Sequence, residues 1–257
     1  MPPTIITQNA DFMVVAKPPD LLSHPTKPDG KPTLLGWLQE KFPGEFVALA
    51  NRLDRETSGT VLVARSPEVA SRLGTMTMRR EIEKQYLALV SGRVESEHGM
   101  IDAPLGRLGI SESNPIWLRQ GVIPLPDALG RKTAEARTEY WRLAAGEACS
   151  LLRLRAHTGR LHQLRVHLAH IGHPVIGDKI YGPDSNLYLK FIAEGWTPEH
   201  QRVLGLYHHA LHAQELRFLW NGEALTFTAL LPEDVREYAG HSFLNHPELV
   251  EGPNPSP

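Results

Sequence analysis

The sequence has one cysteine, Cys149, in 257 residues. A single thiol excludes an intrachain disulfide framework and a zinc site built from several thiolates, and it fits a reducing compartment. The chain also lacks an uninterrupted run of about 18 apolar residues, and its first residues show no basic segment followed by an apolar one. We therefore expect a cytoplasmic protein with no membrane span and no export signal.

Neither sign of charge is in large excess, because 27 Lys and Arg stand against 29 Asp and Glu, a net charge of −2. Any site for a polyanion must therefore be a local patch. The nucleotide-binding patterns G-x-x-x-x-G-K-[ST] and strand-associated G-x-G-x-x-G are also absent, as is the metal-binding H-E-x-x-H. With 41% hydrophobic residues, the chain can bury the core of one large domain or of two small ones.

Short apolar runs bounded by turn formers predict strands. They cover residues 11–16, 61–64, 86–90, 138–143, 150–155, 207–219 and 224–230. Helical patterns follow Thr33 as far as Pro43, run from Pro67 to about Arg80, and cover 160–171. Residues 104–132 contain too many Pro and Gly for regular elements, so we expect an irregular excursion or a ribbon there. Strands and helices alternate, a pattern that is compatible with an α/β protein but does not establish one.

A dense polar segment, residues 51–60, directly precedes the apolar run VLVA. A carboxylate here, Asp54, would have its base fixed by a strand and its oxygens free in a loop, which suits a catalytic group. Arg52 and Arg55 could keep this carboxylate ionised. The alternative is that Asp54 only forms a surface salt bridge with one of these arginines, and the local string does not decide between the two.

A second polar segment covers residues 157–182. It includes Arg165, which a helix over 160–171 would place toward the sheet edge, where a guanidinium can bind carboxylate or phosphate. Residues 150–180 hold five Lys and Arg against one carboxylate, Asp178, and so form a local basic patch. The many histidines raise a metal site, and with it a metal-dependent hydrolase, as an alternative. His208 and His212 would nevertheless lie far apart on a strand, so we expect no metal ligands.

Several ordered segments together form a wider pattern. They are VVAKPPDLLSHP, NRLDRETSGTVLVA, EKQYLALVSG, the A-x-T-x-Y of Ala136 to Tyr140, TGRLHQLRVHLAHIGHPVIGDKIYG and HHALHAQEL. Over roughly residues 9–236 the chain resembles the RluA-type family of RNA pseudouridine synthases, whose hallmark is histidine-arginine-leucine-aspartate followed by threonine, serine and glycine. Asn51 departs from this hallmark, since most members have histidine there. The 104–132 segment is hard to align, and substrate choice could reside in it.

The resemblance implies roles for individual residues. Asp54 would be the catalytic carboxylate, as a nucleophile or as an electrostatic partner of the sugar, and Tyr86 the active-site tyrosine that stacks on uracil or relays a proton. Arg165 would hold Asp54 ionised, and Arg52 would fill the gap left when the target nucleotide is flipped out of the RNA. Further RNA contacts are expected from Arg55, Thr57, Arg160, His162 and Gln163.

The resemblance also implies an α/β (α+β) fold with a central, mainly antiparallel mixed sheet, flanked by helices and crossed by an RNA-binding cleft. We expect a catalytic domain over residues 1–240, a disordered tail over 241–257 and no separate N-terminal RNA-binding module. The expected function is isomerisation of a specific uridine to pseudouridine in a structured ribosomal or transfer RNA. It would need no cofactor, and the enzyme would be a monomer that does not act on DNA. An inactive RNA-binding protein of the same fold is the alternative.

Overall fold

The computed structural model describes residues 2–25, 30–109, 115–125, 130, 132–240 and 243. The chain divides into two compact units, and each is considered by itself. Unit 1 is formed by residues 2–86 and Leu211–Arg236, and unit 2 by Leu87–Ala210 with residues 237–243. The expected disordered tail, 241–257, lies outside the described residues apart from Phe243.

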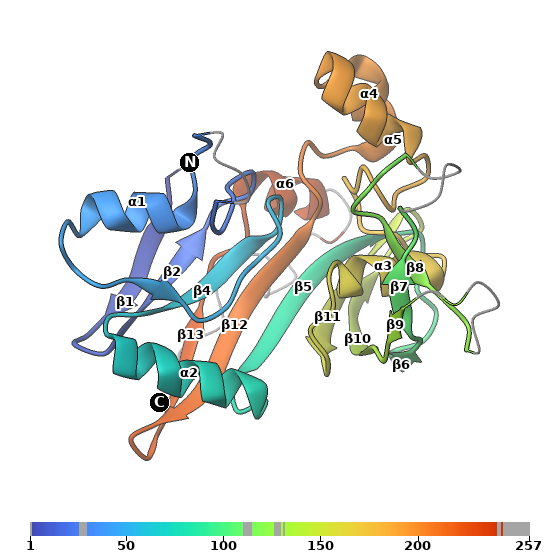
Figure 1. Cartoon of the computed structure of the whole chain (residues 1–257). Helices are drawn as coiled ribbons and strands as arrows, with labels where there is room; N and C mark the ends of the chain where they lie inside the picture. Colours follow the sequence, from blue (N-terminus) through green and yellow to red (C-terminus); the bar gives the residue numbers. More distant parts are fainter. Residues whose placement is uncertain are drawn as a thin grey trace. The chain divides into compact units, whose positions relative to one another are not determined.

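Unit 1 is built on a mixed, mainly antiparallel sheet (Figure 1). Its strands are β1 (Thr4–Gln8), β2 (Phe12–Lys17), β3 (Ala48–Leu49), β4 (Ser58–Ala64), β12 (Leu211–Trp220) and β13 (Glu223–Thr228). The order β1-β2-β4-β12 has β3 beside β4 and β13 beside β12, and only the β4–β12 pair is parallel. At that pair, Gly59 has φ +117°, and a Cβ there would lie 2.2 Å from the backbone oxygen of Ala213. Only glycine therefore permits this close approach.

The sheet of unit 1 is covered on both faces. Alternate residues of β2 enter different clusters: Phe12 and Val14 pack with Leu73 of α2 (Pro67–Met78), whereas Met13 packs with Leu34 of α1 (Leu34–Lys41). Because successive strand side chains point to opposite faces, a strand that is buried on both faces needs an unbroken apolar run. This explains why the DFMVVA and VLVA segments do not alternate with polar residues.

Unit 2 contains strands in the order β5-β11-β10-β6 and a separate small sheet in the order β8-β7-β9. Their bounds are β5 (Glu83–Ser91), β6 (His98–Asp102), β7 (Leu105–Arg107), β8 (Gln120–Val122), β9 (Thr133–Ala134), β10 (Arg137–Ala145) and β11 (Cys149–Ala156). The helices are α3 (Gln163–His170), α4 (Asn186–Glu194) and α5 (Pro198–Leu204). Both β5 and α6 (Glu233–Gly240) begin in unit 1 and end in unit 2.

The predicted α/β class and the mainly antiparallel mixed sheet are confirmed, as are the helices after Thr33 and Pro67. The prediction of a helix from residue 160 is wrong at its start. His162 has φ +57°, so α3 begins only at Gln163, and Leu161 lies outside the helix with 48% of its surface exposed. The strand expected from Tyr207 begins at Leu211, so His208 does not belong to it.

Several elements were not predicted. They are β1, β3, β6, β9, α4, α5 and α6, whereas the 104–132 excursion contains the short strands β7 and β8. Cys149 is buried at the start of β11, as expected of a small core residue. Within the residues that the structure describes, every helix is too short or too polar to cross a lipid bilayer.

Candidate functional site

In unit 1, the loop that carries Asp54 is fixed on both sides by buried polar side chains. On one side, Ser23 Oγ donates to the Leu53 carbonyl at 2.8 Å and accepts from the Leu53 N–H at 3.1 Å. On the other, Asn51 Oδ1 accepts from the Leu62 N–H at 2.8 Å and its Nδ2 donates to the Thr60 carbonyl at 3.3 Å. Asp54 itself is half-buried. The loop therefore presents its carboxylate from a rigid base.

Asn51 is the residue that departs from the family hallmark, and its role is now defined. Its amide supplies one acceptor and one donor to the backbone of β4, so it takes the place of a neighbouring strand at this point. The asparagine thus anchors the loop to the sheet from a buried position. Its departure from histidine leaves a residue that still holds the loop through hydrogen bonds.

Lys17, at the end of β2, is buried beneath the same loop. Its ammonium donates to the carbonyl oxygens of Pro18, Leu21 and Arg55 at 2.9–3.0 Å. Burial lowers the pKa of Lys17 to about 7, while the carboxylate of Asp54, followed by those of Asp20 and Glu56, acts in the opposite direction. The sequence analysis missed this lysine. A lysine directly after a fully apolar strand was the available signal.

Tyr86 is electrostatically coupled to Asp54. Burial, with a smaller contribution from the negative charge of Asp54, raises the pKa of Tyr86 to about 12. The phenol is therefore protonated at neutral pH and can donate a hydrogen bond. Of the three predicted catalytic residues, the structure thus relates these two to each other within unit 1.

The predicted RNA-contacting residues of unit 1 lie on and beside the same loop. Arg52 and Arg55 are exposed, Arg52 Nη1 being 3.2 Å from His24 Nε2 and Arg55 Nε 2.7 Å from Asp20 Oδ1. Thr57 is buried, and its N–H donates to the carbonyl of Asp54 at 3.2 Å. This bond closes a turn that ends where β4 begins.

In unit 2, Arg165 forms a bidentate ion pair with Asp178. Its Nε and Nη2 lie 2.6 and 2.8 Å from the two carboxylate oxygens, and both side chains are buried. Burial alone would raise the pKa of Asp178, but the charge and hydrogen bonds of Arg165 hold it well below its usual range. Asp178 also accepts from the N–H groups of Ile180 and Tyr181. Sequence reasoning noted Asp178 only as a lone carboxylate and missed that it orients Arg165.

Around the start of α3, the remaining predicted residues lie close together. Gln163 is buried, and its Oε1 accepts from Thr158 Oγ1 and from the Arg160 N–H, at 2.6 and 3.1 Å. Arg160 is exposed, and its Nε donates to the Glu135 carbonyl at 3.0 Å. His162 Nδ1 lies 2.8 Å from the hydroxyl of Tyr181. Gln163 therefore shapes the loop that presents Arg160.

The structure gives individual histidines structural partners. His167 is buried between Thr138 Oγ1 and the Ala103 carbonyl, each at 2.9 Å, and burial lowers its pKa. His212 is buried between Ser58 Oγ and the Ala229 carbonyl, at 2.8 and 3.0 Å. Across the described residues, no three His, Cys, Asp or Glu side chains are grouped in a way that could hold a metal ion.

His212 should make stability depend on pH. Burial lowers its pKa from 6.5 to about 4, so between these values the unfolded state binds a proton that the folded state does not. Stability from this group is therefore full above pH 6.5 and is lost as the pH falls toward 4. We expect the slope of unfolding free energy against pH in this range to fall by about 1.4 kcal/mol per pH unit in His212→Gln, measured by urea titration. Parallel curves of unfolding free energy against pH for the wild type and His212→Gln would contradict this. The control is His170→Gln, which removes an exposed histidine.

The chain is similar in sequence to proteins of a known family. Residues 11–170, more than half of the chain, match the model of a family described as RNA pseudouridylate synthase. An uncharacterized RNA pseudouridine synthase of Aquifex aeolicus is 35% identical over 191 residues, which cover 71% of this chain and 57% of that protein. The ribosomal large subunit pseudouridine synthase D of Nitrosomonas europaea is 32% identical over 241 residues, 91% of this chain and 64% of the relative. The chain thus spans less than two thirds of the length of these two curated relatives.

Solved structures support the same conclusion about the fold. The human RNA pseudouridylate synthase domain containing 1 superimposes with a TM-score of 0.68 at 27% identity, covering 89% of this chain and 83% of the human one. The chain therefore belongs to the RNA pseudouridylate synthase family. The resemblance to its RluA-type branch is confirmed by these relatives.

Proposed function

We propose that this protein isomerises a specific uridine to pseudouridine in a structured ribosomal or transfer RNA, with Asp54 as the catalytic carboxylate. The observation that carries the proposal is the position of Asp54, half-buried on a loop that is fixed on both sides and coupled to Tyr86. The family membership supplies the reaction class. The proposal assigns the activity to the domain over residues 1–240.

The reaction requires no redox change and no energy input. The N1–C1′ bond of uridine breaks, the uracil turns, a C5–C1′ bond forms, and the proton leaving C5 is replaced by one at N1. As the glycosidic bond breaks, positive charge develops at C1′, and the Asp54 carboxylate either adds to the sugar or stabilises this charge. Both routes need an ionised carboxylate held near the sugar, and both are served by a rigid loop.

Tyr86 and Arg165 complete the proposed catalytic set. With a pKa of about 12, the Tyr86 phenol keeps its proton at neutral pH, so it offers a ring for stacking on uracil and a hydroxyl for relaying a proton. Arg165 is always charged, and its ion pair with Asp178 uses Nε and Nη2. We propose that this permanent positive charge holds Asp54 ionised.

Access to uracil requires the target nucleotide to leave its stack, at a cost of a few kcal/mol. We propose that exposed Arg52, next but one to Asp54, occupies the space that the flipped nucleotide leaves. Arg55, Thr57, Arg160, His162 and Gln163 are the further proposed RNA contacts. Because Thr57 and Gln163 are buried, we expect them to act by shaping the loops around exposed Arg55 and Arg160.

The proposal is tested by mapping pseudouridine in total RNA from source cells that have or lack this gene. We expect one uridine, or a small set of uridines, in ribosomal or transfer RNA to be modified only when the protein is present. Treating the purified protein with a chelator should leave that activity intact, because the reaction needs no metal Lewis acid. An unchanged map in both RNA classes would contradict the proposal and favour an inactive RNA-binding protein of the same fold.

A further inference from the structure

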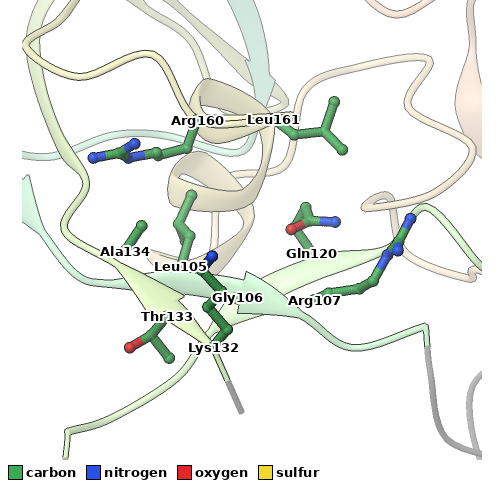
Figure 2. Close-up of a pocket in the computed structure, with 9 residues that line it drawn as sticks. All are labelled: Leu105, Gly106, Arg107, Gln120, Lys132, Thr133, Ala134, Arg160 and Leu161. Carbon is green, nitrogen blue, oxygen red and sulfur yellow. The ribbon is translucent and has the colours of Figure 1, made fainter.

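Unit 2 contains a cavity of about 500 Å³ beside its small β8-β7-β9 sheet (Figure 2). Arg160 and Leu161, which precede α3, lie on one side of it, and the strands that carry Leu105 and Thr133 lie on the other. The remaining lining residues are Gly106, Arg107, Gln120, Lys132 and Ala134. The volume falls within the usual range of small-ligand pockets.

The lining combines positive charge with an apolar surface. Arg107, Lys132 and Arg160 contribute cations, and none of the nine lining residues, all of them described, is acidic. Arg107 is held from one side by Trp117, whose ring centroid lies 4.3 Å from the guanidinium carbon. Leu161 is 48% exposed and supplies an apolar wall. Such a lining suits a ligand that carries a phosphate on one side and a flat apolar face on the other.

The cavity is joined to the proposed catalytic arginine by direct contacts. The N–H of Gln120, in its lining, donates to the hydroxyl of Tyr181 at 3.0 Å, and the same hydroxyl lies 2.8 Å from His162 Nδ1. The Tyr181 ring centroid is 5.0 Å from the guanidinium carbon of Arg165. The pocket wall and Arg165 are therefore parts of one packed cluster. A ligand of the pocket would lie near the elements that orient Arg165.

We propose that this cavity binds one nucleotide of an unpaired RNA segment that flanks the modified uridine, an inference that rests on the proposed function. Arg107 and Lys132 hold the phosphate, because guanidinium and ammonium groups bind phosphodiester oxygens without reading sequence. The base packs against Leu161 and the guanidinium plane of Arg107, since unpaired bases in RNA are recognised by stacking on such surfaces. The cavity would thus fix the register of the bound RNA strand.

The phosphate contact is tested with a fluorescent uridine octamer and anisotropy titrations over a range of salt concentrations. We expect Arg107→Gln/Lys132→Gln to weaken binding at least tenfold and to reduce the salt slope by about 0.7, which corresponds to one phosphate contact on a single strand. Lys132 is exposed, so the single variant Lys132→Gln should fold normally. Its binding can therefore be measured even if the double variant unfolds. Arg202→Gln, which changes an exposed residue of α5, is the matched control. Affinities for all variants within twofold of this control would overturn the proposal.

The base contact is tested with an abasic ribose-phosphate octamer of the same length. We expect Leu161→Ser to weaken binding of the uridine octamer at least threefold and to leave the abasic octamer unaffected. Equal effects on both probes would overturn the assignment to a nucleotide and leave a site for phosphate alone. Photo-crosslinking of a 4-thiouridine octamer to the unmodified protein should label the lining residues, and labelling confined to other segments would overturn it as well.

Pseudouridine formation by the wild-type protein is measured in parallel, so that the two proposals can fail separately. If the wild type modifies RNA but the cavity variants bind like the control, the cavity assignment is wrong and the proposed function stands. If the wild type forms no pseudouridine but the cavity variants lose binding, the proposed function is wrong and the cavity remains a nucleotide site.

Discussion

Asp54→Asn should abolish pseudouridine formation while RNA affinity stays within about tenfold, or ~1.4 kcal/mol. Asparagine has nearly the shape of aspartate, so the loop held by Ser23 and Asn51 should persist. The neutral amide can neither add to the sugar nor balance positive charge at C1′, so both proposed routes would stop. Release of tritium from RNA labelled at uracil C5 measures turnover, because the new C5–C1′ bond forms at the expense of that hydrogen.

The matched control for this experiment is Glu45→Gln, which also removes a carboxylate from unit 1. Glu45 pairs with Arg65 at 2.6 Å on an exposed surface, where an ion pair contributes at most about 1 kcal/mol to stability. We expect its turnover to match that of the wild type. Turnover by Asp54→Asn within tenfold of this control would exclude Asp54 as the catalytic carboxylate, whatever the RNA affinity.

Asp178→Ala should be the most destabilising single substitution near the site. It leaves the guanidinium of Arg165 buried without its bidentate partner and removes the acceptor of two backbone N–H groups. Breaking a buried ion pair from one side costs about 3–5 kcal/mol. Urea unfolding monitored by circular dichroism measures this loss, and Asp102→Ala, in an exposed pair with Arg137, should lose about 1 kcal/mol or less.

A double substitution separates stability from activity at this ion pair. Arg165→Met together with Asp178→Ala removes both charges, so much of the lost stability should return relative to Asp178→Ala alone. Turnover should not return, because Arg165 is proposed to hold Asp54 ionised. A double variant that recovered both stability and turnover would show that Arg165 has only a structural role.

The sequence predicted those features of the candidate site that are formed by residues close together in the chain. The polar loop around Asp54 lies next to a strand with both faces buried, and the unbroken apolar run VLVA made that strand readable. The Arg165–Asp178 pair was not predicted because α3 and the turn after it bring together residues 13 apart, outside the spacing of any regular element. The start of α3 was missed because non-glycine residues seldom adopt the left-handed conformation of His162.

The helices α4 and α5 were missed for a different reason. Their starts carry weak signals: Ser185 makes no side-chain cap, and the capping box at Thr197 uses His200 where glutamate or glutamine is usual. The cavity was also beyond sequence reasoning, because its lining comes from β7, β8, the residues at β9 and the loop before α3, which lie far apart in the chain. Residues that converge from distant segments leave no periodic pattern to detect.

Unit 1 is a discontinuous domain, with most of unit 2, residues Leu87–Ala210, inserted between Tyr86 and Leu211. The strand that follows the Asp54 loop, β4, pairs with β12, and Ser58 contacts His212 across 154 residues. Closing so long a flexible loop is entropically costly and slow. If unit 2 folds first, it shortens the flexible span that must be closed. We therefore expect the Asp54 loop to reach its native conformation only after unit 2 has folded. Unit 2 would then assist the folding of this loop by holding the two segments of unit 1 close together, although Asp54 itself lies in unit 1.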